Sequence, residues 1–123
     1  MSFLSHKECI EEGDTVILYV NPRAMYPIVV KAKKLNKHDE EIENTFQTSF
    51  GCLRVLTLIG KPYGSKVALV KGSGSGWAHV LRPTPELWTS TLPHRTQIIY
   101  TPDISMILFQ LELRPGSIIL EAG

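Results

Sequence analysis

The sequence has few cysteines, almost no net charge and no long apolar run, and each shortage excludes a class of protein. Its only two cysteines are Cys9 and Cys52 in 123 residues, too few for a disulfide scaffold. No stretch approaches the roughly 18 consecutive apolar residues of a membrane span. Thirteen basic against twelve acidic side chains give a net charge of +1, so total charge does not mark a nucleic-acid binder, although a local patch stays open. We expect a reduced, intracellular protein with one domain, or one domain plus part of another.

The usual catalytic and metal motifs are also missing. Residues 60–66 resemble a phosphate loop, but Ser65 stands where that loop requires a glycine before the lysine. Residues 72–76 are rich in glycine, yet a β-type run follows them rather than a helix, which favours a hairpin turn. The histidines have no metal-ligand spacing with the cysteines, and no Ser/His/Asp or Cys/His arrangement can be argued. We therefore assign no metal site and no catalytic residue.

Short β-type runs separated by glycine and proline predict a small antiparallel barrel or sandwich in the first part of the chain. In the last run, Trp77, His79 and Leu81 alternate with Ala78 and Val80, so the two sets lie on opposite faces. The charged segment 31–43 predicts a long exposed hairpin loop, whose lysines either contact phosphate or are simply solvated. The predicted strands are 15–20, 28–33, 46–50, 51–59, 65–70 and 77–81.

The second part of the chain predicts a connector, a helix and the start of an α/β domain. Three prolines in 81–97 exclude a helix interior or a central strand there. Thr101-Pro102-Asp103 is a helix start with Thr101 as the cap, and Arg114-Pro115-Gly116 is a helix stop. The apolar run 117–121 is typical of a buried parallel strand, which needs neighbouring strands. Because the sequence ends two residues later, we expect that domain to be incomplete here. The predicted divisions are 1–82 (β-rich domain), 83–100 (connector) and 101–123 (start of the α/β domain).

Several motifs resemble one enzyme family. Pro-Thr-Pro-Glu-Leu-Trp at 83–88, Pro-His-Arg-Thr-Gln at 93–97 and Leu-Arg-Pro-Gly at 113–116 resemble the catalytic subunit of eukaryotic tRNA (adenine-N1)-methyltransferases. Residues 1–15 and 58–65 are similar to the same subunit, so the resemblance covers nearly the whole chain. Residues 36–44 depart from the family pattern and make a longer loop.

The resemblance implies a fold and an activity. It implies a β-rich N-terminal domain followed by a Rossmann-like domain that binds S-adenosylmethionine, and methyl transfer to N1 of the T-loop adenine in tRNA. It also implies a related non-catalytic partner subunit, a heterotetramer and a nuclear location. The residues themselves predict no metal and no membrane. Glu121-Ala122-Gly123 matches the start of the glycine-rich cofactor turn, where backbone N–H groups approach the ligand closely. The family's acidic ribose-binding residue and catalytic aspartate have no counterpart in these 123 residues, so we expect this chain alone to be inactive.

The resemblance also assigns site residues. Residues 97–101 match the segment that lines the cofactor and substrate pocket, and Gly76-Trp77 matches a substrate-contacting pair. Trp77 either stacks on a base or packs on its own sheet. His94 and Arg95 either fix the connector by hydrogen bonds or contact phosphate or cofactor. The implied cofactor residues are Ile99, Glu121, Ala122 and Gly123. The implied substrate residues are Gly76, Trp77, Gln97, Ile98, Tyr100, Thr101, Val20, Asn21, Pro22, Phe50, Gly51 and Cys52.

Two functions remain open at this point. The first is part of a tRNA methyltransferase subunit. The second is a stand-alone module that binds tRNA or a partner subunit without catalysis. An apolar helix and strand left uncovered at 102–121 disfavour the second, because such faces promote association.

Overall fold

The computed structural model describes residues 6–93 and 97–122. It separates into two units, Met1–Leu92 and Pro93–Gly123. Among the described residues, no helix is long and apolar enough to cross a membrane. His94 and Arg95, for which the sequence left two roles open, lie outside the described residues.

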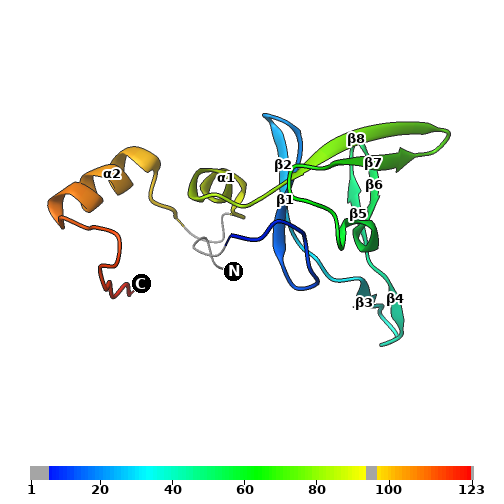
Figure 1. The fold of residues 1–123 in the computed structure, drawn as a ribbon, viewed down its shortest axis with the longest axis horizontal. Helices are drawn as coiled ribbons and strands as arrows, with labels where there is room; N and C mark the ends of the chain where they lie inside the picture. The colour runs from blue at the N-terminus through cyan, green and yellow to red at the C-terminus, as the bar shows by residue number, and fades with distance from the viewer. Residues whose placement is uncertain (1–5, 94–96, 123) are drawn as a thin grey trace. The chain divides into compact units, whose positions relative to one another are not determined.

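A six-stranded antiparallel sheet makes up most of the first unit, with strand order β2-β1-β8-β7-β6-β5 (Figure 1). The sheet curls, and Tyr26 on one edge strand lies 5.6 Å, ring centre to ring centre, from Phe46 on the other. The predicted small antiparallel β domain is therefore confirmed, as one curled sheet. Its strands are β1 (Thr15–Asn21), β2 (Ala24–Val29), β5 (Thr45–Thr48), β6 (Gly51–Arg54), β7 (Lys66–Lys71) and β8 (Gly74–Leu81).

The core lies on the inner face of this curled sheet. Alternation along β8 buries Ala78 and Val80 completely, whereas Trp77 stays 52% exposed on the other face, as the sequence predicts. Apolar burial of this kind stabilises the unit by about 25 cal/mol per Å² removed from water. The inner cluster consists of Ile10, Val16, Leu18, Ile28, Val30, Leu53, Val55, Leu58, Val67, Leu69, Ala78 and Val80.

The second strand is shifted from its predicted position. The sequence predicts 28–33, but β2 starts at Ala24 and ends at Val29, because a tight turn at Pro22 and Arg23 lets pairing with β1 begin early. Pro27 lies inside β2, which is an edge strand. An edge strand tolerates proline because its missing N–H can face away from the neighbouring strand.

The charged segment is a short hairpin and not the predicted loop. β3 (Lys33–Leu35) and β4 (Glu41–Glu43) pair as a separate two-stranded sheet. Lys33 Nζ lies 2.9 Å from Glu41 Oε2 across the two strands, and Arg54 donates to both carboxylate oxygens of Glu43. Opposite charges facing each other across a ladder stabilise it, which the charge composition alone does not reveal.

Two short helices occur where the sequence predicts none. The β-type run 51–59 stops at Arg54 and continues as a 3-10 helix, η1 (Val55–Leu58), whose i and i+3 side chains Val55 and Leu58 are both buried. The proline-rich stretch contains helix α1 (Pro85–Thr91), which contacts β2. Thr84 Oγ1 caps it by accepting a hydrogen bond from Leu87 N at 3.3 Å. Pro85 stands in the first turn, where a missing N–H costs nothing, so the exclusion of helix from 81–97 was wrong.

In the second unit, helix α2 (Thr101–Gln110) confirms the predicted helix, with Tyr100 rather than Thr101 as its N-cap residue. None of its residues is buried. The predicted strand 117–121 does not form, and Ile118 and Leu120 are almost fully exposed. A parallel strand exists only through hydrogen bonds to neighbours, and the described residues of this unit supply none.

Asp14 joins the N-terminal segment to the β unit. Its carboxylate pairs with Lys7 Nζ at 2.9 Å and accepts hydrogen bonds from Glu11 N at 2.9 Å and from Tyr63 Oη at 3.3 Å. Burial pushes the pKa of Asp14 upward, but the hydrogen bonds from Lys7 and from the Glu11 backbone outweigh it, so the pKa is lowered. Burial and the neighbouring Asp14 charge raise the pKa of Tyr63.

We predict that Asp14→Asn destabilises the unit by about 1–3 kcal/mol, because the substitution removes a charged acceptor that serves several donors. A carboxyl whose pKa is lowered by folding stabilises the fold above its unfolded pKa. That contribution disappears as the pH falls through the lower, folded pKa. Urea unfolding at pH 7 and at progressively acid pH measures both effects. The difference between wild type and Asp14→Asn should shrink in acid, and an equal difference at every pH would contradict this role.

Candidate nucleic-acid interface

Three hairpin turns lie at the same end of the sheet. Because neighbouring strands are antiparallel, the β1–β2, β5–β6 and β7–β8 turns all fall at the end where β1, β5 and β7 finish. Lys71 Nζ, at the end of β7, donates to the Ser49 carbonyl oxygen in the β5–β6 turn at 2.8 Å. This end carries most of the substrate residues that the resemblance implies in the first unit, namely Val20, Asn21, Pro22, Phe50, Gly51, Cys52 and Gly76.

Two glycines allow the close approach of backbone at this end. A Cβ on Gly51 would lie 3.0 Å from the Leu69 backbone carbon and 3.1 Å from the Val70 oxygen, and its φ of +141° also disfavours other residues. A Cβ on Gly76 would lie 3.2 Å from the Phe50 carbonyl oxygen. The turn carrying Phe50 therefore rests directly against β7 and β8.

An aromatic and cationic cluster lies on the outer face of the sheet. The rings of Trp77 and His79 meet edge to face with 5.3 Å between their centroids. Lys66 Nζ, from β7, lies 4.3 Å from the centroid of the Trp77 ring. Tyr19 of β1 pairs with His79 and so shares this face. A cation over an exposed ring contributes about 0.5–1 kcal/mol, and an indole exposed on a sheet is the kind of surface on which bases stack.

The charges of the sheet have one sign. Its six strands contain no aspartate or glutamate, but they carry Arg54, Lys66 and Lys71. The acidic residues that balance the total charge lie outside these strands, in the N-terminal segment, the β3–β4 hairpin and residues 86–121. Because Arg54 is paired with Glu43, the cationic character of the sheet comes from Lys66 and Lys71. The near-zero net charge of the chain conceals this local charge, which suits a phosphate-bearing partner.

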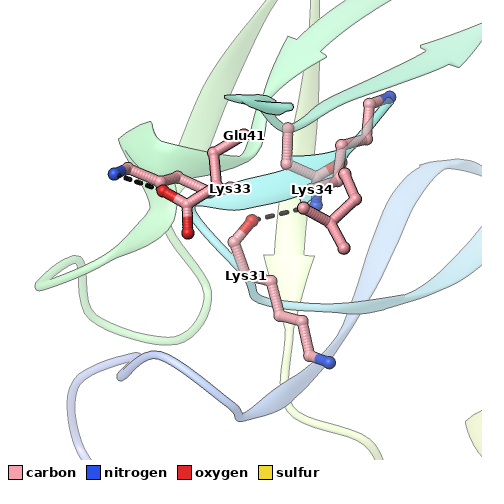
Figure 2. A pocket seen from close by; sticks show the side chains of 6 residues that line it. Lys31, Lys33, Lys34 and Glu41 are labelled. Carbon is pink, nitrogen blue, oxygen red and sulfur yellow. Dashed lines mark hydrogen bonds and ion pairs between the residues drawn. The ribbon is translucent and has the colours of Figure 1, made fainter. Parts of the chain in front are cut away.

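A second basic region, at the β3–β4 hairpin, is not built as an anion site. A pocket there is lined by Lys31, Lys33, Lys34, Leu35, Glu41 and Asn44. Figure 2 shows the side chains of Lys31 and Lys33 running in different directions, with Lys33 held by Glu41. The ammonium groups do not converge on one point, so the solvated alternative fits these lysines better.

The remaining implied residues belong to the second unit. Gln97, Ile98, Ile99 and Tyr100 precede α2, and Thr101 is its first residue. Ile99 is 51% exposed, and Glu121 and Ala122 are also exposed. Gly123 lies outside the described residues. These residues do not by themselves enclose a cofactor, and no step of a reaction is derived from them.

The structure adds two residues that sequence reasoning did not assign to a site. Lys66 is diagonal to Trp77 in the β7–β8 register, in which Lys66 faces His79 and Ala68 faces Trp77. The glycine-rich turn predicts this hairpin, so an explicit register would have placed Lys66 beside the indole. His79 was predicted on the same face as Trp77, and the contact between the two rings confirms that placement.

Comparison with known proteins agrees with the motif resemblance. Residues 76–123 match the family described as tRNA methyltransferase complex GCD14 subunit. The tRNA (adenine(58)-N(1))-methyltransferase catalytic subunit TRM61 of Kluyveromyces lactis is 44% identical over 123 residues, covering 98% of this chain. The chain is thus similar to these catalytic subunits along essentially its whole length.

Other members of the family align over the whole chain. The corresponding subunits of Candida albicans and Schizosaccharomyces pombe are 43% and 37% identical, and each match covers 100% of this chain. The chain spans only about a third of these relatives, namely 28% of the K. lactis, 33% of the C. albicans and 30% of the S. pombe protein.

A solved structure shares the fold. The SAM-dependent O-methyltransferase of Thermotoga maritima superposes with a TM-score of 0.64 and 20% sequence identity, covering 89% of this chain and 36% of that one. At this level of identity the match concerns fold alone. It agrees with the β-rich fold found for most of this chain.

Proposed function

We propose that the chain is part of the catalytic subunit of a tRNA (adenine-N1)-methyltransferase, which transfers a methyl group from S-adenosylmethionine to N1 of the T-loop adenine. The observation that carries this proposal is the 37–44% identity to such subunits across essentially the whole chain. The motifs at 83–88, 93–97 and 113–116 support it independently of the fold.

In this proposal the β unit contacts tRNA. Support comes from the exposed Trp77 indole, from the adjacent Lys66 ammonium and from strands without acidic residues. Stacking of one base on an aromatic side chain contributes about 1–3 kcal/mol. The turn residues Val20, Asn21 and Pro22 at the same end of the sheet, with residues 50–52, would contact the RNA around that base.

The second unit begins the cofactor domain in this proposal. The exposed apolar residues of α2, among them Met106 and Phe109, then pack against the remainder of a Rossmann-like domain. Ile99, Glu121, Ala122 and Gly123 contribute to the S-adenosylmethionine site together with residues outside this chain. Residues 97–101 line the pocket between cofactor and adenine.

Assembly and location complete the proposal. The family description names a tRNA methyltransferase complex, and we extend this to a heterotetramer with a related non-catalytic subunit. We also propose a nuclear location, which rests on the family resemblance alone.

A second candidate is a module that binds tRNA or the partner subunit without catalysis. The β unit has its own closed apolar cluster, which favours independent folding of that part. The two candidates differ in one respect, since only the first transfers methyl groups.

The deciding experiment compares the full-length protein with residues 1–123. Each is co-expressed with the partner subunit and incubated with tRNA transcript and S-adenosylmethionine labelled on the methyl group. We expect label in tRNA with the full-length protein and none with residues 1–123. No transfer by the full-length complex, combined with intact tRNA binding, would favour the binding module.

A further inference from the structure

Lys66, the first residue of β7, is a cation without an acidic partner on the outer sheet face. Among the described residues, ion pairs engage Lys7, Lys33 and Arg54 but not Lys66. The strands on either side of it supply no carboxylate, because none of the six strands contains an acidic residue. Its ammonium lies over the Trp77 ring.

The position of the ammonium matters for any ligand of Trp77. At 4.3 Å from the ring centroid, Lys66 Nζ occupies the space in which a base would stack on that face of the indole. The contact between Lys66 and Trp77 is weaker than base stacking on an exposed aromatic ring. An arriving base therefore displaces the ammonium rather than being excluded by it.

Once displaced, the Lys66 ammonium can pair with a phosphate of the bound RNA. The lysine stem is flexible and carries a compact point charge, and each stacked nucleotide carries a phosphate. With no competing carboxylate on the sheet, phosphate is the anion that Lys66 meets in such a complex.

We infer that Lys66 and Trp77 form a single nucleotide-binding unit, in which an unpaired base of tRNA stacks on the indole and Lys66 pairs with a phosphate of the bound strand. This inference rests on the proposed tRNA contact of the β unit. It adds Lys66 to that contact and assigns stacking and charge pairing to different residues. Trp77 supplies sequence-tolerant stacking, and Lys66 supplies the salt-dependent part of binding.

The test uses the full-length protein with its partner subunit and fluorescently labelled tRNA, with affinity measured by anisotropy across a salt series. Lys66→Met removes the charge but keeps an apolar stem over the ring. We expect affinity to fall by about 3- to 10-fold at low salt, and the slope of log K against log salt to decrease by about 0.7–0.9, the value for one lost phosphate contact.

A matched control and a double variant complete the design. Lys37→Met removes the same charge from an exposed position in the β3–β4 hairpin and should change affinity less than 2-fold, roughly the effect of net charge alone. Combining Lys66→Met with Trp77→Ala should give less than the product of the two separate losses, because both residues bind the same nucleotide.

The outcomes separate this inference from the proposed function. If wild type methylates and binds tRNA but Lys66→Met behaves like Lys37→Met, the inference is wrong and the proposed function stands. Fully independent losses in the double variant would also overturn the shared-nucleotide unit. If the wild-type complex neither binds nor methylates tRNA, the proposed function is wrong, and the inference that rests on it is wrong as well. Equal melting temperatures for the variants and wild type show that folding does not cause the loss.

Discussion

Replacing Gly51 by alanine should lower the free energy of unfolding of the β unit by about 2–4 kcal/mol. Two effects add, because alanine is strained at a positive φ and its methyl group overpacks the site. The new methyl group would lie 3.0 Å from the Leu69 backbone carbon and 3.1 Å from the Val70 oxygen, and φ at Gly51 is +141°. The obstructing atoms are mostly backbone, so no side chain can rotate to relieve the clash. Urea unfolding followed by circular dichroism measures the loss.

Two other glycines serve as graded controls for this prediction. Gly60 has φ of +83° but open space around its Cβ position, so Gly60→Ala should cost only the backbone strain, about 1–2 kcal/mol. Gly74 has an ordinary φ, and its nearest atom is 3.5 Å away, so Gly74→Ala should change stability by about 0.5 kcal/mol or less. If Gly51→Ala proved no worse than Gly74→Ala, the close approach of the β5–β6 turn to β7 would be contradicted.

Replacing Trp77 by alanine should weaken tRNA binding by the full-length complex by about 10- to 100-fold, the equivalent of one lost base stack. The indole is 52% exposed, so its removal deprives the outer face of its largest aromatic surface while leaving the buried cluster intact. Trp77→Phe keeps a smaller ring in the same place and should recover part of the affinity. Electrophoretic mobility shift or anisotropy with tRNA transcript provides the measurement.

A matched control separates stacking from loss of exposed apolar surface. Val70 lies on the same outer face and is 57% exposed, but it offers no ring, so Val70→Ala should leave affinity near the wild-type value. The alternative role of Trp77 is packing on its own sheet. In that case Trp77→Ala would lower the melting temperature substantially and leave the affinity of the folded protein unchanged.

The hairpins of the sheet could be predicted because the signals for them lie in residues that are close together in the sequence. Alternation at 77–81 predicts which side chains share a face, and the glycine-rich turn at 72–76 predicts a hairpin. The structure confirms these features, with the β7–β8 turn reduced to the two residues between Lys71 and Gly74. Strand order was not predictable in the same way, because the pairing of β1 with β8 joins residues about sixty positions apart.

The errors have identifiable physical causes. Thr84-Pro85-Glu86 has the same residue types as the predicted helix start Thr101-Pro102-Asp103. The prediction took the three prolines of 81–97 to exclude a helix interior and did not use this signal. The apolar run 117–121 has the composition of a buried strand, yet composition cannot supply the neighbours that a strand needs. The charged hairpin required knowledge of which lysine faces which glutamate, and this depends on register.

Only part of the candidate site could be predicted from the sequence. Trp77 was identifiable from its place in an alternating strand and from the family resemblance. Lys66 can be assigned to the site only once the β7–β8 register is known. The cationic character of the sheet is found only when the charges of the strands are counted separately from those of the loops. The cofactor roles proposed for Ile99, Glu121, Ala122 and Gly123 rest on the family resemblance alone.

The most direct test of the account identifies the methylated nucleoside. tRNA transcript is incubated with S-adenosylmethionine and the full-length protein with its partner subunit, and the product is digested and analysed by mass spectrometry. Reverse transcription of the same product maps the position. The account predicts 1-methyladenosine at the T-loop adenine, with less product when Trp77 is replaced by alanine at limiting tRNA. Methylation at another base or position, or no methylation by a complex that binds both tRNA and cofactor, would contradict it.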